Sequence, residues 1–143
     1  MEVAEEYGLI FTTHSSEPAG HLYTGKGHTT PDVLWRFIQN SQKFSNVKIV
    51  CAHWGGGLPF YALMPEVKDA LTNVYFDTAA SPFLYKPDVF STVERLVGAD
   101  HILFGSDYPL LRPKRVLANL EESGLPNETQ QTIRTSGLRL LGL

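Results

Sequence analysis

The chain has 143 residues, a formal net charge of -3, 43% hydrophobic residues and 19% charged residues. This composition is typical of a soluble globular protein with a buried core, and its mild acidity argues against nucleic acid as a partner. No apolar run approaches the roughly 20 residues of a membrane helix, and the single cysteine, Cys51, excludes an internal disulfide, so we expect a cytoplasmic protein.

Four short apolar runs predict β-strands, and each run ends in polar residues. The runs cover residues 9–14, 47–53, 74–78 and 102–107. Because their apolar side chains follow one another almost without interruption, the runs are typical of parallel strands that are buried on both faces.

Helix signals fill the segments between these strands. Three helices are expected to open at prolines, namely Pro31, Pro87 and Pro113. Pro65 interrupts the segment 59–71, which predicts either a kinked helix or two short helices. Asn127 and Gln130 have the spacing of a capping box and predict the start of the last helix.

The alternation of strands and helices predicts one α/β domain over residues 1–143, because right-handed crossovers place successive strands in a parallel sheet. Two architectures fit this pattern. One is a small doubly wound sheet, and the other is part of an eight-stranded (β/α)₈ barrel. The residues at the strand ends are needed to choose between them.

Side chains that can bind a metal stand at the ends of the predicted strands. His14, His53 and Asp107 end three of the strands, and Asp77 lies at the end of the remaining one. Each residue taken singly could instead cap a helix, but in parallel α/β folds this end of the sheet carries the chemistry. Strand alternation would place His53 on the same face as Cys51. Imidazole and carboxylate groups together suit a divalent cation such as Zn²⁺.

The strand ends also resemble those of a known family. Their motifs are THSSEP, AHWGGG, YFDTAAS and LFGSDYP, and RLLGL closes the chain. Together they are similar to the last four strand ends and the final helix of the amidohydrolase-related metal hydrolases, a branch that includes aminocarboxymuconate-semialdehyde decarboxylase-like enzymes. The resemblance implies a partial TIM (β/α)₈ barrel with a parallel sheet. It further implies that His14 and Asp107 bind the metal, that His53 is a catalytic acid or base, and that Asp107 also moves protons.

One part of the family pattern is missing from the sequence. The family takes two further metal ligands from a His-x-His pair after strand one, and no His-x-His occurs in the 143 residues. A whole barrel of this kind needs roughly 250 residues. The chain therefore resembles the C-terminal half, with strands five to eight. Because a half-barrel has unpaired sheet edges, we expect a homo-oligomer or pairing with a missing N-terminal half.

The resemblance implies a metal-dependent hydrolase that cleaves a C–N or C–O bond of a small carbonyl substrate with metal-activated water. Zn²⁺ is the first choice of metal, and we expect no activity from this chain alone. Non-oxidative decarboxylation is the alternative within the family. A non-catalytic half-barrel that has lost its metal is the alternative from another class.

The glycine-rich loop after the first strand offers candidate substrate contacts. It nearly matches a phosphate-binding loop, but Gly27 follows Lys26 where that motif requires Ser or Thr, so nucleotide binding is not expected. The candidate substrate-binding residues are Glu17, His21 and His28 in this loop, together with Trp54 after the second strand. The alternatives are a plain surface loop and, for Trp54, packing in the turn after the second strand.

Overall fold

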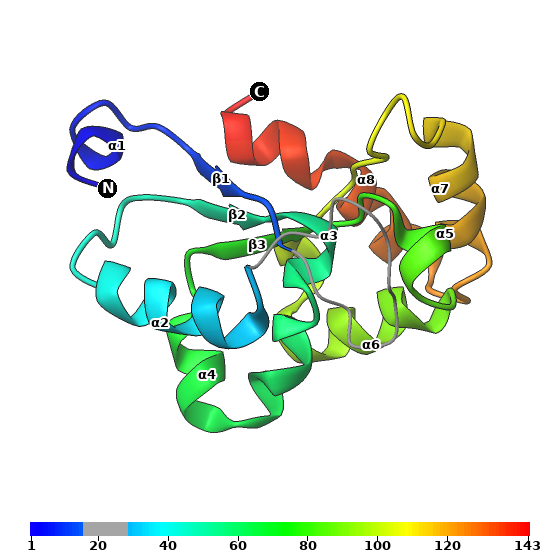
Figure 1. Cartoon of the computed structure of the whole chain (residues 1–143). Coiled ribbons are helices and arrows are strands. Elements are labelled where there is room, and N and C mark those ends of the chain that lie inside the picture. Colours follow the sequence, from blue (N-terminus) through cyan, green and yellow to red (C-terminus); the bar gives the residue numbers. More distant parts are fainter. Residues whose placement is uncertain (16–28) are drawn as a thin grey trace.

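The computed structural model describes residues 1–15 and 29–143, and its centre is a four-stranded parallel sheet (Figure 1). The strands lie side by side in chain order: β1 (Phe11–Thr13), β2 (Ile49–Cys51), β3 (Val74–Asp77) and β4 (Ile102–Leu103). All neighbouring pairs are parallel. The four predicted strands are confirmed, but each is shorter than its apolar run, because most of the polar residues that end the runs lie in loops.

Helices fill the segments between the strands. They are α1 (Glu2–Glu6), α2 (Pro31–Ser41), α3 (Ala52–Gly55), η1 (Leu58–Leu63), α4 (Pro65–Ala70), α5 (Ser81–Leu84), α6 (Asp88–Val97), η2 (Ala99–His101), α7 (Pro113–Glu121) and α8 (Asn127–Leu141). Pro31 and Pro113 open helices as predicted, and Pro65 separates η1 from α4. Pro87 immediately precedes α6 as its N-cap residue, so the helix predicted after Pro87 is also confirmed. No helix in the described part of the chain is long and apolar enough to cross a membrane.

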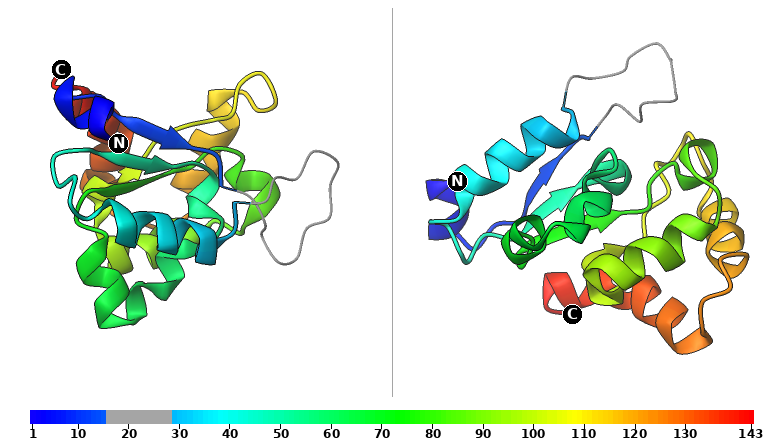
Figure 2. Two further views of the ribbon diagram at one scale, coloured as in Figure 1. Left: turned by 60° about the vertical axis from the view of Figure 1, so that its left-hand side comes forward. Right: turned by 90° about the horizontal axis from the view of Figure 1, so that it is seen from below.

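The two faces of the sheet are covered unequally. Helices α2, α4 and α6 lie on one side of the sheet (Figure 2). The main core includes buried side chains of these helices and of the strands. The strand residues buried in this core are Ile49, Cys51, Val74, Phe76 and Ile102. On the opposite face, Val50 and Leu103 form a small cluster with Leu140 from the end of α8. Helices mostly on one side are typical of a barrel wall, because a doubly wound sheet is covered on both faces.

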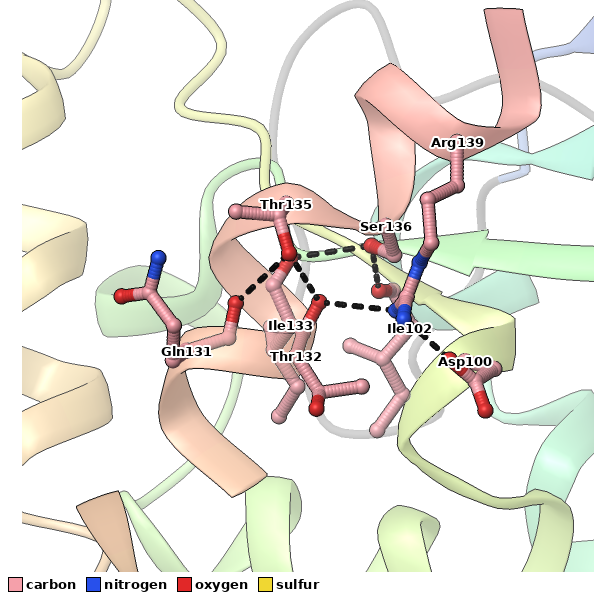
Figure 3. Close-up of polar contacts among 8 residues, drawn as sticks. All are labelled: Asp100, Ile102, Gln131, Thr132, Ile133, Thr135, Ser136 and Arg139. Atoms are coloured by element: carbon pink, nitrogen blue, oxygen red, sulfur yellow. Dashed lines mark hydrogen bonds and ion pairs between the residues drawn. The ribbon is translucent and has the colours of Figure 1, made fainter. Parts of the chain in front are cut away.

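Helix α8 covers part of the outer edge of β4 (Figure 3). The hydroxyl of Ser136 lies within hydrogen-bond distance of the backbone oxygens of Ile102 in β4 and Ile133 in α8 itself. Arg139, one turn further along α8, forms an ion pair with Asp100 in η2. The carbonyl group of Ile102 therefore has a partner at an edge of the sheet, where strands often leave such groups unpaired.

Ser136→Ala is expected to lower the free energy of unfolding by about 1–3 kcal/mol, because it leaves the buried carbonyl of Ile102 without a donor. Thr135→Ala is the matched control, since the hydroxyl of Thr135 bonds only to oxygens of its own helix. Urea unfolding followed by circular dichroism measures both changes. An equal loss in the two variants would show that the contact with β4 adds nothing specific.

Candidate functional site

Three of the predicted site residues, His14, His53 and Asp107, lie at the carboxyl ends of the strands. The rings of His14 and His53 have their centroids 4.9 Å apart, with an angle of 70° between their planes. Burial, and then the neighbouring His53, lower the pKa of His14, while the carboxylates of Asp107 and Asp77 act in the opposite direction. The carboxylates of Asp107 and Asp77 are therefore near enough to His14 to act on its charge.

His53 reaches this region through a left-handed turn that follows β2. Its φ and ψ are 54° and 50°, and those of Trp54 are 56° and 30°. Residues with side chains seldom adopt this conformation, which costs about 1–3 kcal/mol for each one and persists only where the surroundings hold it. β2 ends at Cys51, whose side chain is fully buried in the core beneath the helices. His53 lies in the turn beyond the strand, so strand alternation does not decide where its side chain points. The prediction that His53 shares a strand face with Cys51 is therefore wrong.

Asp77, at the end of β3, holds the turn in place. One oxygen of its carboxylate, Oδ1, accepts hydrogen bonds from the backbone N–H of His53 at 2.8 Å and of Ala79 at 3.0 Å. Burial raises the pKa of Asp77, and the two backbone hydrogen bonds oppose this shift. In the sequence, Asp77 is marked only by its place at the end of a predicted strand. Its contact with His53 crosses from one strand to the next, so no local pattern indicates it.

Thr78, the residue after Asp77, fixes the start of the segment that carries Asp107. The hydroxyl of Thr78 donates to the backbone oxygen of Gly105 at 2.8 Å and accepts from its N–H at 3.0 Å. Asp107 follows with a left-handed φ of 66° and an exposed side chain. Its backbone oxygen accepts from the N–H of Leu110 at 2.8 Å. Asp77 and Thr78 thus contact the segment that follows β2 and the segment that follows β4, respectively.

The side chains at this edge suit a divalent metal in kind but fall short in number. His14 supplies an imidazole nitrogen and Asp107 a carboxylate oxygen, both ordinary ligands of such ions. Within residues 1–15 and 29–143, no group of three or more His, Cys, Asp or Glu side chains is placed to hold a metal ion. Cys51 is no substitute, because burial raises the pKa of its thiol to about 12 and keeps it protonated.

Trp54 is the one predicted substrate contact that lies among the described residues, and it is not at this site. Trp54 is fully buried, its indole N–H donates to the hydroxyl of Ser81, and its ring packs edge-on against Phe90. A side chain enclosed in this way cannot touch a substrate, so the assignment of Trp54 to substrate binding is corrected to a structural role. The other three candidates, Glu17, His21 and His28, lie outside the described residues.

Gly55, which follows Trp54, is expected to tolerate no side chain. A Cβ atom there would lie 2.8 Å from Cε1 of Phe76, and the φ of +57° is unfavourable for other residues. Gly55→Ala should therefore lower the free energy of unfolding by about 1–3 kcal/mol. Gly137→Ala in α8 is the control; it meets no atom within 4 Å and should instead be stabilising by about 0.5–1 kcal/mol. Thermal unfolding of the two variants, with opposite shifts of Tm, checks both.

Comparison with solved structures supports the fold. A 2,6-dihydroxybenzoate decarboxylase from Rhizobium is 20% identical with a TM-score of 0.75, and the match covers 97% of this chain and 53% of that one. A dihydroxybenzoic acid decarboxylase from Polaromonas sp. JS666, with bound manganese and the inhibitor 2-nitroresorcinol, is 19% identical with a TM-score of 0.78, covering 99% and 52%. An uncharacterized TIM-barrel protein from Bordetella bronchiseptica is 18% identical with a TM-score of 0.68, covering 99% and 48%.

These similarities establish that the chain folds as part of a TIM barrel, and it spans about half the length of the structures it matches. A search of curated proteins found no match. A family model described as Amidohydrolase matches residues 1–133, nearly the whole chain. By this match the chain belongs to the amidohydrolase family, whose members include metal-dependent enzymes with decarboxylase or hydrolase activity.

Proposed function

We propose that residues 1–143 form the C-terminal half of an amidohydrolase-type barrel, and that they contribute His14, His53 and Asp107 to a metal-dependent active site. In this proposal His14 and Asp107 bind a divalent metal, and His53 transfers a proton. The observation that carries it is the proximity of the two imidazoles, since the ring centroids of His14 and His53 lie 4.9 Å apart at the carboxyl ends of the strands. His53 Nδ1 lies 3.1 Å from the backbone oxygen of Ala79, which fixes the ring's orientation.

The metal of this site is Zn²⁺ or Mn²⁺. Zn²⁺ is the choice that the ligand types favour, whereas the dihydroxybenzoic acid decarboxylase from Polaromonas sp. JS666 contains manganese. When bound, such an ion supplies a Lewis acid that polarises an oxygen of the substrate. The residues of this chain orient the substrate and move its proton.

The reaction that we place first is non-oxidative decarboxylation of a small hydroxylated aromatic carboxylate. The decarboxylases among the similar structures support it, since two of them act on dihydroxybenzoates. The bond between the ring carbon and the carboxylate carbon breaks, and CO₂ leaves. His53 then donates the proton that replaces the carboxylate on the ring carbon. A neutral histidine must first take up this proton, either from the substrate hydroxyl or from solvent.

Hydrolysis of a C–N or C–O bond is the second candidate, and the description of the matching family favours it. His53 would then accept a proton from the attacking water, and Asp107 would pass a proton to the leaving group. The same side chains serve both reactions, so the substrate decides between them. The two candidates differ in their product, which is CO₂ in one case and an amine or alcohol in the other.

We further propose that a second half-barrel completes the site, either as another polypeptide or as a second copy of this chain. The exposed edge of β1 is the place where a further strand would pair, since β1 has β2 on one side and no neighbour on the other in the described sheet. Strands with an open edge readily add a partner. The described residues also supply too few metal ligands, which a second half would complete.

The test is to purify the protein, measure its metal content after dialysis, and assay it with added Mn²⁺ or Zn²⁺. A panel of hydroxybenzoates is assayed for CO₂ release, and a panel of amides, esters and lactones for hydrolysis. Metal-dependent CO₂ release would support decarboxylation, and metal-dependent hydrolysis would support the second candidate. No retained metal and no turnover in either panel, from a preparation in which this chain is paired with a second half-barrel, would contradict both and favour a non-catalytic half-barrel.

A further inference from the structure

The imidazole of His53 is held in one tautomer. Its Nδ1 lies 3.1 Å from the backbone oxygen of Ala79. Because a carbonyl oxygen can only accept, the hydrogen bond places the proton of the neutral ring on Nδ1 and leaves the lone pair on Nε2. Free histidine in water prefers the opposite arrangement, with the proton on Nε2. The fold therefore imposes the less common tautomer on His53.

Asp77 places the two partners of this hydrogen bond next to each other. Its Oδ1 atom accepts from the backbone N–H of both His53 and Ala79. One carboxylate oxygen thereby ties the residue that carries the ring to the residue that carries the carbonyl. The bond from the His53 ring to the Ala79 oxygen and the Asp77 bridge thus join the same two residues.

The link also holds a backbone conformation that would otherwise relax. His53 and Trp54 are both left-handed, and neither is a glycine. Trp54 is anchored by its buried ring and by Ser81, whereas the N–H of His53 is bound by Asp77. Asp77 is thus the contact that keeps residue 53, rather than residue 54, in this turn.

We infer that Asp77 is a positioning residue that sets the tautomer of His53, so that the bare nitrogen, Nε2, is the one offered to the site. Its use for proton transfer or metal binding rests on the proposed function, but the tautomer itself does not. Asp77 acts through the backbone of residues 53 and 79, and it does not need to touch a substrate.

The experiment is long-range ¹H–¹⁵N NMR of the imidazole nitrogens in the full chain, at a pH where the histidines are neutral. His53 is assigned with a His53→Asn variant. The wild-type spectrum should show the proton of His53 on Nδ1. His101 is an internal reference, because its Nδ1 lies 2.7 Å from the backbone oxygen of Val74 and should show the same tautomer.

Asp77→Ala should shift His53 toward the Nε2-protonated form or a mixture of the two, with His101 unchanged. Asp77→Asn should retain the wild-type tautomer, since the amide oxygen can still accept both N–H groups. Asp69→Ala, an exposed acid on α4, should change neither ring.

A wild-type His53 with its proton on Nε2 would overturn the inference, and this result needs no variant to fold. A folded Asp77→Ala protein with an unchanged His53 would overturn the part played by Asp77. Both readouts are independent of turnover. Absence of activity in a metal-loaded preparation that contains a second half-barrel would thus count against the proposed function and leave the positioning of His53 standing.

Discussion

Trp54→Ala is expected to lower the free energy of unfolding by about 3–5 kcal/mol, the largest effect of any single truncation that we propose. The indole is fully buried, and its ring lies 5.0 Å from that of Phe90 between centroids. Its removal would leave a cavity in the main core and take the indole donor from Ser81. Urea unfolding followed by circular dichroism measures the change.

Tyr61→Ala is the control for this truncation, because Tyr61 is an aromatic residue that is 53% exposed. It should change the free energy of unfolding by less than about 1 kcal/mol. Similar losses for Trp54 and Tyr61 would contradict the structural role of Trp54. A stable Trp54→Ala protein with weakened substrate binding would restore the substrate contact that the sequence suggested.

His53→Gln is expected to lower kcat by about 10²–10⁴-fold in the metal-loaded, active protein, because it removes the group that transfers the proton. Metal content should stay at the wild-type value, since His53 is not a ligand in the proposed site. Steady-state kinetics and metal analysis of the same preparation measure both quantities.

His101→Gln is the matched control, since His101 lies in η2 before β4, away from the carboxyl ends of the strands. Its kcat should stay within about 2-fold of wild type. Loss of metal together with activity in His53→Gln would show that His53 is a ligand and not the proton-transfer residue. Unchanged kcat would remove His53 from the mechanism altogether.

The order of elements could be predicted from the sequence because its signals are local. Apolar runs marked the four strands, and Pro31 and Pro113 marked helix starts, since proline has no N–H to lose at that position. The strand ends were less accurate, because residues such as His53 continue an apolar run in sequence but leave the sheet in space.

The site could be predicted only in part, because its residues are local but their contacts are not. His14, His53 and Asp107 were found from their positions after strands. The hydrogen bond from His53 to Asp77 depends on the pairing of β2 with β3. Trp54 follows a site residue directly, yet the left-handed turn sends its side chain into the core. Alternation along a strand cannot describe two such residues in a row.

The end of β3 and the residue after it, Asp77 and Thr78, have a consequence for how a complete site would assemble. Asp77 fixes the turn of His53, and Thr78 fixes Gly105 just ahead of Asp107, through contacts within this chain. The entropy cost of ordering these segments is therefore met when the chain folds and not when a second half-barrel binds. This chain would then offer its partner a surface that is already ordered. The affinity of the two halves would depend on the entropy cost of ordering the partner's own segments.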